Sequence, residues 1–128
     1  MRADQRKEAD LMEAHSLKNI EFQKVLNLSA LVEYQPGQVV SRTLVQNSAV
    51  SVTLFAFDAG EEISSHSSNG DAMVTVLEGK SCITIGEQSF SVTGGETIVM
   101  PAGVPHAVAA DGKFKMQLTV VFPQKGAD

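Results

Sequence analysis

Residues 95–106 read Gly-Glu-Thr-Ile-Val-Met-Pro-Ala-Gly-Val-Pro-His, a short apolar run followed by a loop that ends in a histidine. Thr, Ile and Val are enriched in β-strands, so the run predicts a strand. Pro101 and Pro105 restrict the loop, which lowers the conformational entropy lost when His106 is held in one place. The segment therefore predicts a strand, a rigid loop and a histidine that the loop presents.

A second segment with a histidine lies upstream. Residues 60–79 read Gly-Glu-Glu-Ile-Ser-Ser-His-Ser-Ser-Asn-Gly-Asp-Ala-Met-Val-Thr-Val-Leu-Glu-Gly. Asn, Gly and Asp at 69–71 are typical turn residues. In the strand expected after this turn, Ala72, Val74 and Val76 share one face, because successive strand side chains point to opposite faces. We expect that face to be small, apolar and directed inward.

The rest of the chain from Leu31 onward has the same character. Short runs rich in Val, Ile, Thr and Phe alternate with turn residues at the roughly 8–12-residue spacing typical of β-sandwiches and barrels. Segments of helical period are missing between these runs, which excludes a series of βαβ units. In Ile85-Gly86-Glu87-Gln88, glycine at the first central position predicts a type II′ hairpin turn. The sequence therefore predicts an all-β domain over residues 31–128.

Residues 1–30 differ from this pattern and predict an N-terminal arm or short helix. Residues 2–15 are rich in Arg, Lys, Asp, Glu and Ala, most of which favour helices. Two roles stay open for this arm, a cover over the β-domain or a contact with a second subunit. In residues 49–58 both alternating faces are largely apolar or small, so one face needs such a cover or a partner subunit. A homodimer is one expectation.

Composition limits the classes of partner. The 128 residues fit one domain, and a net charge of −5 argues against nucleic acid or a membrane surface as partner. Cys82 is the only cysteine, so an intrachain disulfide is excluded. No apolar stretch approaches the length of a transmembrane helix. We expect a cytoplasmic protein.

The two histidine segments resemble the two motifs of the cupin superfamily. The first motif has glycine, five residues, a His-x-His pair, a glutamate and a second glycine; here Gly60, His66 and Gly79 fit it. The second has glycine, five residues, Pro-x-Gly, two residues and a histidine; Gly95, Pro101, Gly103 and His106 fit it. The resemblance covers about Pro36 to Pro123. It implies a double-stranded β-helix, the cupin jelly-roll barrel, in which His66 and His106 point inward from one wall.

The departures from these motifs concern the metal ligands. Cupins bind a divalent metal such as Fe, Mn, Ni, Cu or Zn through the two histidines and the glutamate of the first motif and the histidine of the second. Here Ser68 and Ala72 stand in place of a histidine and the glutamate, so His66 and His106 form an incomplete ligand set. Substitute ligands are Glu62, which shares the strand parity of His66, Gln117, and Asp71 if a bulge turns it inward. The other hypothesis is a metal-free barrel in which both histidines are pocket residues, while His15 is exposed.

Three function classes follow. The first is a small-molecule binding barrel, with a pocket lined by His66, Ser68, Ala72, Val74, His106, Val108 and Met116. Met73, Met100 and Met116 are expected to fill gaps in the core, and the other hypothesis is that they adapt the pocket walls. Arg42 is expected to pack its stem and hold its charged end in water, but it would suit a carboxylate ligand if it points inward. The second is an enzyme, either a metal-dependent oxygenase, isomerase or lyase, or one that uses the histidines as general acid and base. The third is a non-catalytic dimeric structural or regulatory barrel.

Overall fold

The computed structural model describes residues 15–125, so residues 1–14 of the predicted arm lie outside the described residues. Its regular elements are one 3-10 turn, η1 (Leu28–Leu31), and the strands β1 (Val39–Gln46), β2 (Val50–Phe57), β3 (Glu62–His66), β4 (Asp71–Glu78), β5 (Lys80–Ile85), β6 (Gln88–Thr93), β7 (Thr97–Met100), β8 (His106–Ala110) and β9 (Phe114–Val121). Within residues 15–125, no helix is long and apolar enough to cross a membrane.

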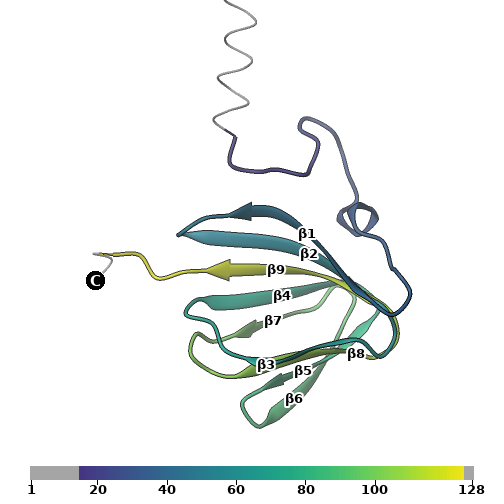
Figure 1. Cartoon of the computed structure of the whole chain (residues 1–128), viewed down its shortest axis with the longest axis vertical. Coiled ribbons are helices and arrows are strands. Elements are labelled where there is room, and N and C mark those ends of the chain that lie inside the picture. Colours follow the sequence, from purple (N-terminus) through teal and green to yellow (C-terminus); the bar gives the residue numbers. More distant parts are fainter. Residues whose placement is uncertain (1–14, 126–128) are drawn as a thin grey trace, which may run out of the picture.

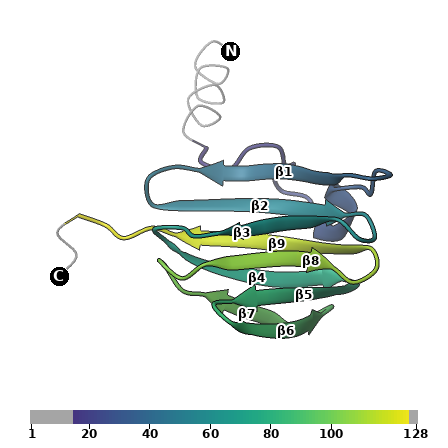
Figure 2. The same cartoon turned by 60° about the horizontal axis from the view of Figure 1, so that its bottom comes forward.

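The strands form two antiparallel sheets that face each other (Figure 1). One sheet has the order β1-β2-β9-β4-β7 and the other β3-β8-β5-β6. Figure 2 shows β3, β8, β5 and β6 in front of β9, β4 and β7. Strands close in sequence alternate between the two sheets, as in a jelly roll. The prediction of an all-β cupin-type barrel is confirmed.

The core fills the space between the two sheets. Val74 and Val76 of β4 and Ile83 of β5 are at most 1% exposed. Phe57 and Phe114 stack in the same cluster, with ring centroids 4.5 Å apart. Each large apolar side chain buried in this way stabilises the fold by roughly 1.5–3 kcal/mol. The alternating pattern seen in the sequence therefore corresponds to one continuous interior.

The turn between β5 and β6 agrees with its sequence. Gly86 has a φ of +59°, whereas Glu87 is not among the residues with positive φ. A positive φ at the first central position only is the signature of a type II′ turn. The predicted hairpin is confirmed, and its Gly86 N–H donates to the carbonyl of Pro105, next to His106.

The segment before β1 covers the outer face of β1 and β2. Ile20, Leu28 and Leu31 pack against a cluster that includes Leu44 and Leu54. Of the two roles considered for the N-terminal region, residues 20–34 thus have the first, a cover over the sheet.

Arg42 fixes this covering segment to the sheet. Its guanidinium donates to the carbonyl oxygens of Asn19 and Leu31 at 2.7 and 2.6 Å. Because both acceptors belong to the covering segment, Arg42 points out of the barrel. The alternative in which it points inward toward a carboxylate ligand was wrong, and its guanidinium binds backbone carbonyls where water was expected.

Candidate functional site

His66 and His106 lie directly opposite each other on neighbouring strands. His66 is the last residue of β3, His106 is the first of β8, and the two are Cα partners in the antiparallel ladder. Side chains at such positions share one face of the sheet and touch. The two ring centroids are 4.5 Å apart, with an angle of 68° between the ring planes. Residues 40 positions apart in the sequence thus form one pair.

A β-bulge in β3 places His66 in this pair. Ile63 is paired with Val108 and His66 with His106, so two residues on β3 lie opposite Ala107 alone. In a regular strand, residues three positions apart point to opposite faces of the sheet. Ile63 nevertheless packs against the core, on the face that also carries His66. The extra residue of a bulge has this effect on strand parity. Consequently Glu62 is exposed on the outer side, and the expectation that it faces inward with His66 was wrong.

Backbone carbonyls hold both rings. Nδ1 of His66 contacts the carbonyl oxygen of Ser64 at 2.9 Å, and Nδ1 of His106 contacts that of Val104 at 3.2 Å. Each ring therefore uses the carbonyl two residues before it. These carbonyls were not identified from the sequence, because every residue has one and only the local backbone path directs it at a ring.

The loops beside the pair are tied together. The Gly103 N–H donates to the carbonyl oxygen of Ser68 at 2.8 Å, and the Ala102 N–H donates to the carboxylate of Asp71 at 2.9 Å. The Ser68 hydroxyl is occupied by the backbone of Gly70. The loop before His106 is therefore fixed to the turn after His66.

The two histidines differ in burial. His106 is 3% exposed, whereas His66 is exposed. Burial lowers the pKa of His106 and nearby His66 lowers it further, while the contact with the Val104 carbonyl acts in the opposite direction. The lowered pKa of His106 favours the neutral form of its ring at pH 7.

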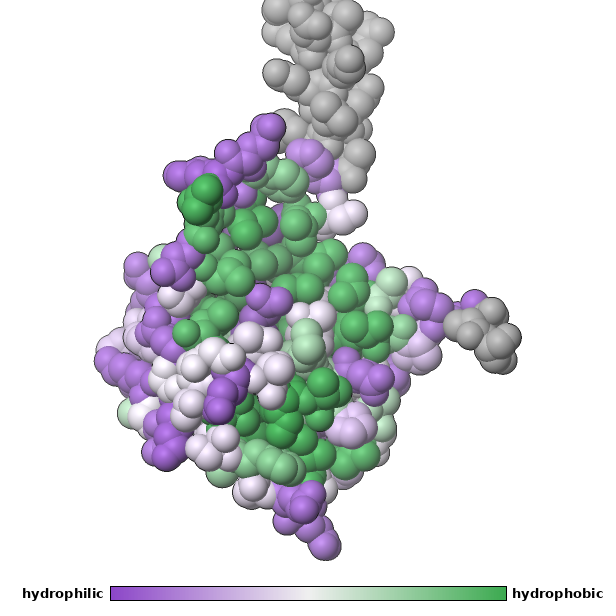
Figure 3. Space-filling view, turned by 180° about the vertical axis from the view of Figure 1, so that it is seen from behind, coloured by the Kyte–Doolittle hydropathy of each residue, from purple (hydrophilic) through white to green (hydrophobic). Residues whose placement is uncertain are grey.

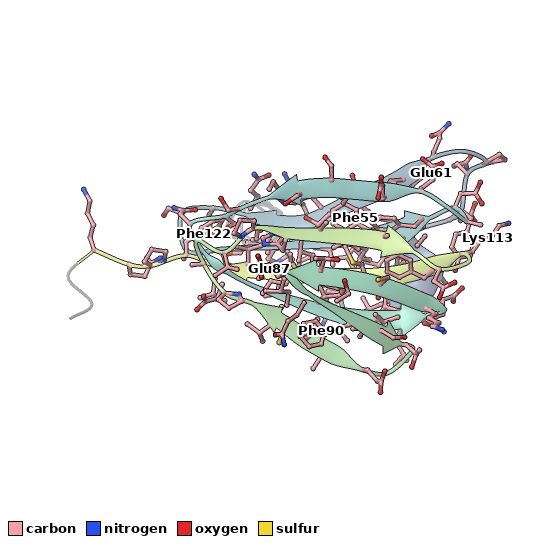
Figure 4. All side chains as sticks on the ribbon, turned by 90° about the horizontal axis from the view of Figure 1, so that it is seen from below. Phe55, Glu61, Glu87, Phe90, Lys113 and Phe122 are labelled. Carbon is pink, nitrogen blue, oxygen red and sulfur yellow. The ribbon has the colours of Figure 1, made fainter. Side chains whose placement is uncertain are left out.

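The pair lies at one end of the barrel. In Figure 4, Phe122 and Glu87 lie at the end where β3 finishes and β8 begins, and Glu61 and Lys113 lie at the opposite end. A cavity of about 280 Å³ also opens near Phe122, lined by Asn69, Asp71, Ala102, Val121, Phe122 and Pro123. Neither histidine contributes to its lining.

The other residues predicted to line the pocket lie in two environments. Ala72, Val74, Val108 and Met116 are buried in the core cluster, at most 3% exposed, as is Met100. Ser68 is half-buried in the turn described above.

Two further candidates lie on the outer face of the first sheet. Met73 is 40% exposed there, and the Gln117 side chain bonds to the Thr119 hydroxyl. The idea that Met73 forms a pocket wall was wrong, and so was the idea that Gln117 substitutes for a metal ligand.

Comparison with known proteins identifies the family. The family model for the cupin domain matches residues 53–122, which include both histidine segments. This chain belongs to the cupin family. The match spans β3 to β9 completely, so the bulge, the histidine pair and the linked loops all lie within the cupin domain.

Solved structures extend the likeness over most of the chain. A conserved protein of unknown function from Streptococcus pyogenes is 49% identical, with a TM-score of 0.84, over 86% of this chain and 96% of that one. A cupin superfamily protein from Desulfitobacterium hafniense is 32% identical, with a TM-score of 0.81, over 85% and 100%. Among curated proteins, an uncharacterized protein from Streptomyces coelicolor is 28% identical over 95 residues, 74% of this chain and 81% of that one.

Cupins are often metal proteins, but the side chains around this pair do not form a metal-binding set. No group of three or more His, Cys, Asp or Glu side chains suited to a metal ion occurs among the described residues. Glu62 faces outward, and Asp71 accepts from Ala102 on the opposite side of its strand. Transition-metal sites usually use at least three protein ligands. Two imidazoles match only a weak, exchangeable site in this cupin.

Proposed function

We propose that this cupin binds a small organic molecule at the end of its barrel, with His66 and His106 as the polar contacts. The observation that carries the proposal is the ring pair itself, one ring exposed and the other 3% exposed, with centroids 4.5 Å apart. Binding sites of this kind combine apolar walls with a few convergent polar groups.

The surroundings of the pair support this reading. The strand partner of His106 on β5 is Ile85, which is half-buried and packs against the core, as does Ile63. The Ser68–Gly103 and Asp71–Ala102 hydrogen bonds hold the loops in place before a ligand arrives. A site that is already ordered loses less entropy on binding. The pair is therefore an ordered polar contact point beside apolar side chains.

A thermal-shift screen with small acids, sugars and phenols tests the proposal. A compound that binds only the folded state raises the melting temperature, and the shift grows with the ratio of its concentration to its Kd. We expect at least one class to do so in the wild type and to lose the effect in H66A, an exposed position that tolerates the change. H15A is the matched control, since His15 is exposed and stacks on Phe22 instead. If no class of compound raises the melting temperature, or if H66A shows the same rise as the wild type, the proposal is contradicted.

A further inference from the structure

The contacts at Nδ1 fix the tautomers of both histidines. A carbonyl oxygen has no hydrogen to give, so a ring nitrogen within hydrogen-bond distance of it must be the donor. Nδ1 of His66 lies 2.9 Å from the Ser64 carbonyl, and Nδ1 of His106 lies 3.2 Å from the Val104 carbonyl. Each neutral ring therefore carries its hydrogen on Nδ1 and has a lone pair on Nε2.

These two Nε2 lone pairs are free to accept. Neither Nε2 atom has a hydrogen-bond partner among the described residues. In the same residues, every side-chain nitrogen or oxygen that is fully buried does have a partner. Nε2 of His106 therefore keeps contact with solvent, although the residue is 3% exposed. The rings cannot satisfy each other, because two acceptors do not form a hydrogen bond. Each Nε2 can therefore accept a hydrogen bond from water or from a ligand that replaces the water with a donor of its own.

Charges in the neighbourhood do not favour an anion here. Arg42 donates to carbonyls on the outer side of the first sheet. The ion pairs of the described part are Lys24–Glu21 and Lys80–Asp111, and neither involves a histidine. Among residues 15–125, no acidic side chain pairs with either ring, and in the Nδ1–H form each ring offers its Nε2 as an acceptor.

We infer that the ligand of this site presents neutral hydroxyl groups as hydrogen-bond donors to Nε2 of His66 and His106. The inference rests on the proposed binding function and names its ligand class, an alcohol or phenol with an apolar body. A neutral hydroxyl suits the half-buried Ile85, the strand partner of His106 on β5, because burying an ammonium or carboxylate beside it costs much more.

The first test is the imidazole nitrogen NMR spectrum of the full chain labelled with ¹⁵N-histidine. Free Nδ1–H and Nε2–H tautomers have distinct nitrogen shifts, so the assignment is direct. We expect His66 and His106 to show Nδ1–H and His15 to serve as the internal reference. An Nε2–H tautomer at either position would overturn the inference and leave the proposed function standing.

The second test titrates the same sample with phenol, its methyl ether anisole, and benzoate. We expect phenol, whose single O–H donates one hydrogen bond, to shift Nε2 of the exposed His66 and to bind about tenfold more tightly than anisole, the difference that one hydrogen bond makes. In H66N the side-chain amide still provides an N–H for the Ser64 carbonyl but no acceptor at the position of Nε2, so phenol binding should weaken by about tenfold. In H66Q the longer side chain has an amide oxygen that can take the place of Nε2, so phenol should bind as it does to the wild type. Equal binding of phenol and anisole, or preference for benzoate, refutes the ligand class alone. If no probe moves either ring, the binding function fails as well.

Discussion

At the scale of single residues, His106 should make stability depend on pH in a specific direction. Burial holds its pKa below the ordinary value of about 6.5, so the unfolded chain takes up a proton before the folded one does. Its contribution to stability is complete above about pH 6.5, falls as the pH drops through that value, and becomes constant below the folded pKa.

Urea unfolding of the wild type and of H106N at pH 7.5 and 5.5 measures this contribution. We expect the wild type to lose more stability between the two pH values than H106N does. H15N is the control and should follow the wild type, because His15 is exposed. An identical pH response in wild type and H106N would show that His106 titrates alike in the folded and unfolded chain.

The ligand set of the pair gives a second prediction at this scale. Two imidazoles without a nearby carboxylate form an exchangeable site, so purified protein should retain little metal. Elemental analysis of untagged protein from metal-rich medium should find less than about 0.1 equivalent of transition metal per chain, since a complete site holds its ion. One equivalent surviving dialysis would mean that a further ligand completes the site.

At the scale of elements, the one-residue connection at Gly79, through which the chain passes from β4 in one sheet to β5 in the other, depends on glycine. Its φ is +82°, and a Cβ there would lie 2.2 Å from the Lys113 carbonyl oxygen, which is backbone and cannot move cheaply. Gly60 has nearly the same φ, +81°, but a Cβ there meets nothing within 4 Å. The two positions therefore separate steric overlap from backbone strain.

We expect G60A to cost about 1–2 kcal/mol, the strain of a left-handed residue, and G79A to cost distinctly more, about 3 kcal/mol or above. Chemical denaturation of both variants under one set of conditions makes the comparison. Equal losses of stability would show that the Lys113 loop moves aside to admit the methyl group.

The same elements show what the sequence can and cannot predict. Strand rhythm, the Gly86 turn and the inward position of His106 follow from local patterns and from the cupin motifs, and the structure agrees with them. The outward position of Glu62 does not, because a bulge adds one residue to β3 and no residue type between Ile63 and His66 announces it. Likewise, the Ser64 and Val104 carbonyls that orient the rings are backbone atoms, so their role depends on the path of the chain.

At the scale of the whole molecule, the outer face of the five-stranded sheet is covered over β1 and β2 but not over the strands at its other edge. The N-terminal segment packs over β1 and β2, but Met73, Val99 and Val121 farther along the sheet are 40%, 52% and 56% exposed. Val99, Met73 and Thr119 form a row across β7, β4 and β9. Figure 3 shows apolar side chains gathered over the N-terminal segment and again lower on the same side. An exposed apolar sheet face of this kind usually marks an interface.

We predict that two copies associate through this row about a two-fold axis, so that the uncovered half of one sheet covers that of the other. A stable interface of this type buries roughly 800 Å² on each partner. Light scattering at micromolar concentration should give twice the 13.6 kDa mass of one chain.

V99E should return the single-chain mass, because a symmetric interface buries each new charge twice. S91E, on the exposed outer side of the other sheet, should remain a dimer. A wild type with the single-chain mass would refute the homodimer, whereas a dimer unaffected by V99E would move the interface to another face.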